Sequence, residues 1–190
     1  MVSSGAMKPM DLVVIGIGSL VGAVVATASQ QRTWIAGNRR QRVLHEAGHA
    51  VLAWRSPYLD LASVTIVPRE GLFYATDGGH TDVKTRYPKW QTHDNVFEVS
   101  IVLMAGLAGE EMFGDAAKPD TARSDLDEAS RLLGMMYPPH AIPSVRETAS
   151  AWARWRLNGI RDDFGRLCAA LDAHETLLAP QLHWILGAPA

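Results

Sequence analysis

Residues 45–49 read H-E-A-G-H, which is the pattern H-E-x-x-H. On a helix, residues four apart lie on one face, so the imidazoles of His45 and His49 can reach one metal ion while Glu46 projects beside them. A zinc ion held by two histidines and one further protein ligand keeps an open position for water, and a nearby carboxylate can take a proton from that water. The pattern therefore predicts a zinc-dependent hydrolase. A chance amphipathic helix with two surface histidines would give the same five letters.

The H-E-x-x-H residues lie within a helix that the sequence predicts from Asn38, as its N-cap, to about Trp54. The β-branched, alternating residues 63–67 predict a strand, which we expect to pair with residues 72–76 through a short turn. Residues 78–88 begin with two glycines and end with a proline, so they are predicted to form a loop.

Three further helices are predicted downstream. One begins at residue 94 or 95 and ends at Gly114, and the next begins at residue 121 or 124 and ends before Pro138. A long final helix is expected over residues 144–173, with an apolar side formed by Trp152, Trp155, Phe164, Leu167 and Leu171. The expected fold class is mainly α with a small β-hairpin or sheet.

Residues 40–178 resemble the FtsH-type ATP-dependent zinc metalloprotease domain at several points that occur in the family's order. The similar segments are H-E-A-G-H-A-V at 45–51, V-T-I-V-P-R at 64–69, A-G at 105–106 with E-E at 110–111, S-D-L at 124–126, and E-T-L at 175–177. The resemblance implies a zincin-like peptidase domain over residues 38–186, with Zn²⁺ as cofactor and polypeptides as substrates.

The resemblance also implies the third metal ligand. In that family it is the aspartate of the S/N-D-L segment, which corresponds to Asp125. The residues alone leave Glu110 and Glu111 as rivals, although neighbours on a helix point about 100° apart, so at most one could face a metal. The resemblance gives these glutamates no ligand role, and their ordinary interpretation is ion pairing or a solvated helix end. The expected site is thus His45, His49 and Asp125 on zinc, with Glu46 as general base.

Two departures from the family pattern occur near this site. Leu107 replaces an arginine, and residues 120–123 alter the T-G-A that precedes the family's aspartate. The family also places a hexameric unfoldase ahead of the peptidase, for which 190 residues leave no room. We therefore expect an endopeptidase that cleaves unfolded or flexible proteins without an ATPase of its own. A separate unfoldase and a homo-oligomer are left open, and the alternative function is a non-catalytic, membrane-anchored adaptor that retains the fold.

The predicted strand offers a candidate substrate-binding edge. An extended peptide could add to Val64, Thr65, Ile66 and Val67 as a further strand. The competing interpretation of these residues is ordinary core packing.

The N-terminus predicts a membrane anchor within residues 1–31. Leu12 to Ala28 carries no charge and approaches the lower limit of about 17 residues for a bilayer span. Four arginines follow between residues 32 and 42, while only Lys8 precedes the apolar run. The positive-inside bias therefore predicts a single-pass protein with its peptidase domain in the cytoplasm. A cleaved signal peptide, ending in Ala26-Thr27-Ala28, is the alternative.

Composition excludes two other classes. Lys and Arg number 18 against 20 Asp and Glu, a balance that lacks the basic footprint of nucleic-acid binding. One cysteine cannot form a disulfide scaffold.

Overall fold

A computed structural model describes residues 39–67, 79–86, 92–114 and 122–189. The chain divides into two units, residues 1–38 and 39–190. The predicted anchor at residues 1–31 therefore lies outside the described residues. Within the described ranges, every helix is too short or too polar to cross a bilayer.

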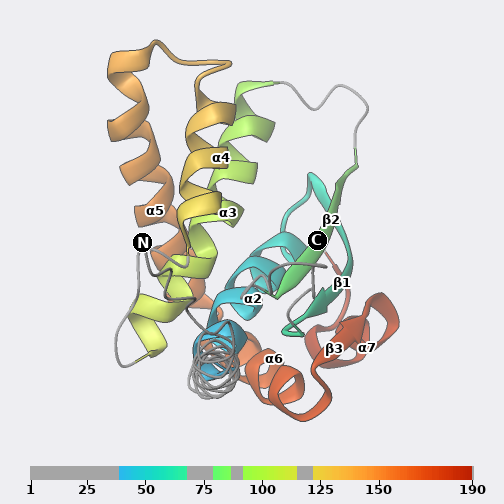
Figure 1. The fold of residues 1–190 in the computed structure, drawn as a ribbon. Helices are drawn as coiled ribbons and strands as arrows, with labels where there is room; N and C mark the ends of the chain where they lie inside the picture. Colours follow the sequence, from blue (N-terminus) through green and yellow to red (C-terminus); the bar gives the residue numbers. More distant parts are fainter. Residues whose placement is uncertain (1–38, 68–78, 87–91, 115–121, 190) are drawn as a thin grey trace, which may run out of the picture. The chain divides into compact units, whose positions relative to one another are not determined.

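The described part is mainly helical with a small sheet, as the sequence predicts (Figure 1). Its helices are α2 (Arg39–Trp54), α3 (His93–Phe113), α4 (Arg123–Leu133), α5 (Ile142–Gly159), α6 (Arg161–His174) and α7 (Ala179–Leu186), with a 3₁₀ turn η2 (Pro139–Ala141). The strands are β1 (Leu59–Thr65), β2 (His80–Thr85) and β3 (Thr176–Leu178).

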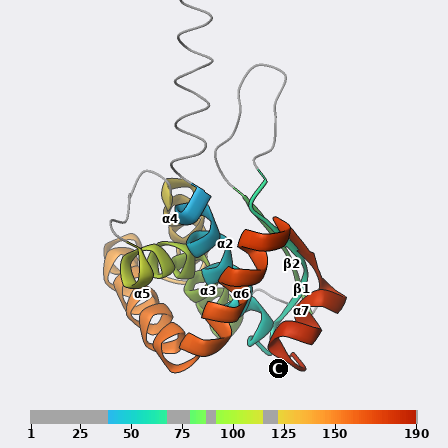
Figure 2. The same ribbon diagram turned by 90° about the horizontal axis from the view of Figure 1, so that it is seen from below.

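Helix α2 is central and is buried almost completely from Val43 onward. It lies between α3 on one side and the strands β1 and β2 on the other (Figures 1 and 2). Glycines allow α2 and α3 to approach closely, since a Cβ at Gly48 would lie 2.2 Å from the carbonyl oxygen of Ala105. A Cβ at Gly109 would likewise lie 2.6 Å from the carbonyl oxygen of Leu44. This close contact brings the H-E-x-x-H face of α2 against the backbone of α3.

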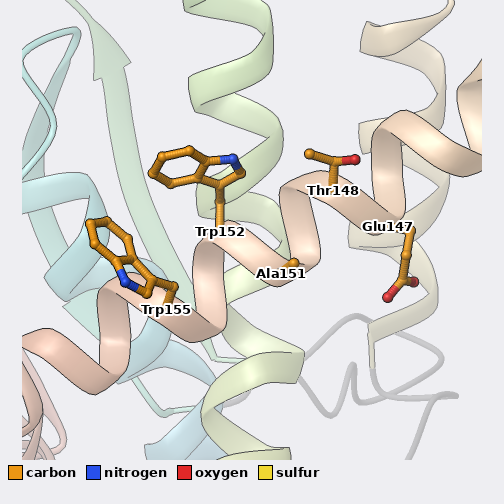
Figure 3. Close-up of a pocket in the computed structure, with 5 residues that line it drawn as sticks. All are labelled: Glu147, Thr148, Ala151, Trp152 and Trp155. Carbon is orange, nitrogen blue, oxygen red and sulfur yellow. The ribbon is translucent and has the colours of Figure 1, made fainter.

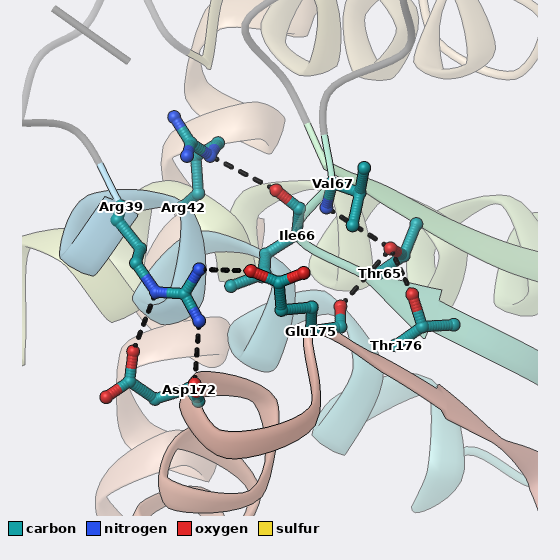
Figure 4. A network of polar contacts seen from close by, with 8 residues as sticks. All are labelled: Arg39, Arg42, Thr65, Ile66, Val67, Asp172, Glu175 and Thr176. Atoms are coloured by element: carbon teal, nitrogen blue, oxygen red, sulfur yellow. Dashed lines mark hydrogen bonds and ion pairs between the residues drawn. The ribbon is translucent and has the colours of Figure 1, made fainter. Parts of the chain in front are cut away.

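The first turn of α2 is tied to elements that follow much later in the chain (Figure 4). Arg39 bonds to the side chains of both Asp172 and Glu175, at and just beyond the end of α6. Arg42 donates from Nε to the carbonyl oxygen of Ile66, at 3.2 Å. Exposed ion pairs contribute little free energy singly, but a shared network costs less side-chain entropy per bond. These contacts fix α2 against α6 and the sheet.

The sheet has the order β2-β1-β3, with both pairings antiparallel. The predicted hairpin partner of β1 is wrong. Strand β1 pairs with residues 80–85, which were predicted to be a loop. Residues 72–76, the expected partner, lie outside the described residues. The sequence did not predict strand β2, because most of its residues are polar. An outer strand tolerates such residues, since one of its faces can be solvated.

The expectation that Val64–Val67 forms a sheet edge is also wrong. Val64 and Thr65 lie in the central strand, where β2 occupies one side and β3 the other. Val64 is fully buried, and Ile66 donates its N–H to the carbonyl oxygen of Glu175. Only Val67 is exposed, beyond the end of β1. Core packing therefore describes Val64 and Ile66, and both sides of Val64 and Thr65 are already paired with other strands.

Helices α3 and α4 match their predictions closely. Thr92 caps α3 by accepting a hydrogen bond from the N–H of Asn95, and the helix ends at Gly114 as expected. Helix α4 begins at Arg123, between the two predicted start points, and ends before Pro138.

The long final helix is wrong as a single element, because the chain breaks at Ile160 into α5 and α6. Phe164, Leu167 and Leu171 are buried as predicted, but Trp152 and Trp155 are exposed on the outer side of α5 (Figure 3). The buried face of α5 is instead formed by Ala149, Ala153 and Leu157. Small residues at this spacing let α5 pack closely against α3, which leaves the tryptophans outside.

Candidate metal centre

Three side chains from two helices converge beside α3. Nε2 of His45 lies 3.0 Å from Nε2 of His49 and 3.0 Å from Oδ2 of Asp125, which is 3.3 Å from Nε2 of His49. The histidines come from α2 and the aspartate from the first turn of α4. Each offers one ligand atom to the same point, so this group could hold a metal ion. All three residues proposed as ligands from the sequence are thus brought together.

The far nitrogen of each imidazole is fixed by a hydrogen bond to α3. Nδ1 of His49 lies 2.7 Å from the carbonyl oxygen of Val102, and Nδ1 of His45 lies 2.7 Å from Oε1 of Glu110. A carbonyl or carboxylate oxygen can only accept, so both Nδ1 atoms carry the hydrogen. The two Nε2 atoms are therefore the ones presented to a cation, an arrangement typical of histidine metal ligands.

Glu110 orients the imidazole of His45, a role that the sequence did not predict. It is 1% exposed, so it is not a solvated helix end, and its carboxylate also accepts a hydrogen bond from Gln41. Glu111 points to the exposed surface, where it forms an ion pair with Arg154. Neither glutamate belongs to the ligand group among the described residues. One feature of the sequence could have indicated this role. Gly106 and Glu110 are four residues apart, so they lie on the same face of the helix, the face toward α2.

Gly106 leaves space for the imidazoles. A Cβ at this position would lie 2.5 Å from Nε2 of His49 and 2.7 Å from Nε2 of His45. These are the atoms that point toward the common centre. A side chain at residue 106 would therefore occupy space that the two histidines and a bound ion need. The A-G segment was noted in the sequence, but its steric role depends on how α3 packs against α2.

Glu46 is buried next to the ligand group and bonded to the sheet. It is 5% exposed, and Oε2 accepts a hydrogen bond of 2.7 Å from Oγ1 of Thr81 on β2. The backbone before β2 packs against its stem, because a Cβ at Gly79 would lie 2.5 Å from Cγ of Glu46. Thr81 was missed from the sequence because its segment was predicted to be a loop.

The charged groups of this site shift one another's pKa values. Burial by itself lowers the pKa of His45, but hydrogen bonds to Asp125 and Glu110, with the charges of Asp125 and Glu46, raise it to about 10. Burial by itself raises the pKa of the Asp125 carboxyl, but hydrogen bonds with the two histidines hold it well below its usual range. Because a histidine ligand has to be neutral, binding of a metal ion here would release a proton.

Other histidines and the pocket on α5 are separate from this group. His80 lies in β2 rather than in a loop, and His93 begins α3 with its ring against Tyr137. The pocket on α5 is lined by Glu147, Thr148, Ala151, Trp152 and Trp155 (Figure 3). It contains none of the candidate ligands.

Comparisons with known proteins add no assignment: neither a protein-family model nor a curated protein matches the chain.

Proposed function

We propose that the chain is a zinc-dependent endopeptidase of the FtsH type that hydrolyses unfolded or flexible proteins without ATP. One observation carries the proposal: the convergence of His45, His49 and Asp125 beside a buried glutamate on the same helix. A purely structural metal site needs ligands but no such carboxylate. The position of Glu46 therefore favours catalysis over the alternative of a non-catalytic adaptor.

Zinc fits the ligand group. Bonds of about 2.0–2.1 Å in tetrahedral directions place neighbouring ligand atoms roughly 3.3 Å apart. The three ligand separations here are 3.0, 3.0 and 3.3 Å, so a slight expansion would admit the ion. Two imidazoles and one carboxylate are a common catalytic set, and three protein ligands leave the fourth position for water.

The proposed mechanism assigns the proton transfers to Glu46. A bound zinc ion would polarise the substrate carbonyl and lower the pKa of water to about 7. Glu46 takes a proton from the water as it attacks the peptide carbonyl, and it then delivers a proton to the leaving nitrogen. Glu110 and the carbonyl of Val102 keep His45 and His49 oriented throughout.

The outer strand β2 supports an extended polypeptide as substrate. Among the described residues, β2 pairs with β1 on one side and with no strand on the other. Its unpaired backbone groups could bond to a peptide in the manner of a further strand. Because Thr81 of β2 contacts Glu46, such a peptide would pass close to the proposed general base.

We also propose the membrane location that the sequence predicts. The N-terminal apolar run would anchor the chain once in the membrane, with the peptidase domain in the cytoplasm. Hydrolysis without ATP would restrict substrates to flexible or unfolded chains, because folded domains expose extended segments only in a minor open population. A separate unfoldase or self-association would extend this range.

Metal analysis combined with a protease assay tests the proposal. The purified full-length protein is expected to contain about one zinc per chain and to degrade casein without ATP. A chelator should abolish the activity and added zinc should restore it, while ATP should have no effect. Zinc binding without any hydrolysis would support the adaptor, and efficient degradation of a stably folded protein would contradict the proposed substrate range.

Glu110→Ala is expected to weaken zinc binding about 10- to 100-fold, because His45 would lose the acceptor that orients its ring. Competition with a chromophoric chelator measures the affinity. Glu111→Ala is the matched control, since this neighbour is exposed and bonds to Arg154 instead. Equal affinities in the two variants would show that the hydrogen bond from His45 to Glu110 does not support the metal.

A further inference from the structure

The hydroxyl of Thr81 faces the proposed general base. From this geometry we infer that Thr81 is a positioning residue that holds Glu46 in its reactive orientation. The inference rests on the proposed function and deepens it by assigning a task to the strand β2. Oγ1 of Thr81 donates to Oε2 of Glu46 at 2.7 Å, a distance typical of a hydroxyl hydrogen bond to a carboxylate.

The register of the sheet explains why Thr81 points toward α2. Thr81 is directly opposite Val64 of β1, and opposite residues of an antiparallel pair project to the same face. Val64 is fully buried on the side that packs against α2. Thr81 therefore projects toward α2 as well, and it places a hydroxyl where an aliphatic residue would otherwise complete the packing.

An irregularity in β1 sets this register. The pairing shifts between Leu61 and Ser63, so that Leu61 is opposite Val83 while Val64 is opposite Thr81. Leu61 and Val64 are both buried although they are three residues apart, which uninterrupted alternation would forbid. Such bulges redirect side chains, and this one aligns Thr81 with Glu46.

The contacts of Glu46 leave one carboxylate oxygen available for proton transfer. Thr81 occupies Oε2, and Oε1 has no hydrogen-bond partner among the described residues. Gly79 packs against Cγ and Cδ, which restricts rotation of the side chain. The carboxylate is thus fixed at its stem and at one oxygen, and Oε1 is the atom assigned to proton transfer.

Three substitutions test this role in the zinc-loaded full-length protein. Thr81→Val removes the hydroxyl with little change of shape, and it is expected to lower kcat about 10-fold on a flexible casein peptide. KM should change less than about twofold, and zinc content should stay unchanged. Thr81→Ser should restore kcat because it returns the donor. Thr148→Val makes the same chemical change on the exposed side of α5, where the hydroxyl donates to the backbone carbonyl of Ser144, and it should match the wild type.

Several outcomes would overturn the inference. They are an unchanged kcat in Thr81→Val, a loss of zinc in that variant, or a failure of Thr81→Ser to recover activity. If Thr81→Val does not fold, Thr81→Ala takes its place against the same serine variant. In a Glu46→Gln background, removal of the hydroxyl should cause no further loss. A wild type that loads zinc but hydrolyses no peptide overturns the proposed function, and this role with it, whereas an active Thr81→Val overturns only the role.

Discussion

Replacing Glu46 with glutamine is expected to leave zinc bound while lowering peptide hydrolysis by about 10²- to 10⁴-fold, the usual contribution of a general base. The amide is nearly the same size as the carboxylate, and its oxygen can still accept the hydrogen bond from Thr81. The fold and the three ligands should therefore persist. What is lost is an atom that can take a proton from the attacking water.

Zinc content and kcat, measured on the same preparation, separate these effects. Glu111→Gln makes the same chemical change on the exposed side of α3 and should retain full activity. Undiminished turnover in Glu46→Gln would remove this residue from the mechanism. Loss of zinc together with activity would indicate that the carboxylate supports the metal site rather than the reaction.

The local part of the site was predictable from the sequence. His45, Glu46 and His49 are placed by helical periodicity, which needs no knowledge of the tertiary fold. Asp125 is different, because it reaches the histidines only through the packing of α4. Periodicity alone left Glu110 as its rival, and the resemblance to a known family was needed to prefer the aspartate.

The residues that support the site could not be predicted in the same way. Glu110, Gly106 and Thr81 act through contacts between elements that are distant in sequence. Thr81 was harder still to predict, because the strand that carries it is mostly polar and was not recognised as a strand.

The fold shows the same division between local and tertiary signals. Gly114 located the end of α3 correctly, whereas the start, predicted at residue 94 or 95, lies at His93 with Thr92 as its cap. The break between α5 and α6 and the outward position of Trp155 depend on which face of α5 packs against α3. Large apolar residues suggested one face, whereas the small residues of the opposite face allow the closer contact.

Gly106→Ala is expected to weaken zinc binding by at least about 100-fold, at or above the upper range for loss of an outer-shell partner. The added methyl would lie 2.5 Å from Nε2 of His49 and 2.7 Å from Nε2 of His45. Favourable contacts between heavy atoms are about 3.5–4.0 Å, so the imidazoles have to move away from their common centre with Asp125. Zinc affinity, measured by chelator competition, should fall as far as it does in Asp125→Ala, which removes a ligand outright.

The fold should survive this change, because alanine is a better helix former than glycine by about 0.5–1 kcal/mol and the residue lies within α3. Circular dichroism and thermal unfolding check this point. Gly165→Ala in α6 is the matched control, since a Cβ there meets no atom within 4 Å, and it should keep full zinc affinity. If Gly106→Ala binds zinc as tightly as the wild type, the ion cannot lie between the two Nε2 atoms. The proposed centre would then be wrong even though its histidines are four residues apart on one helix.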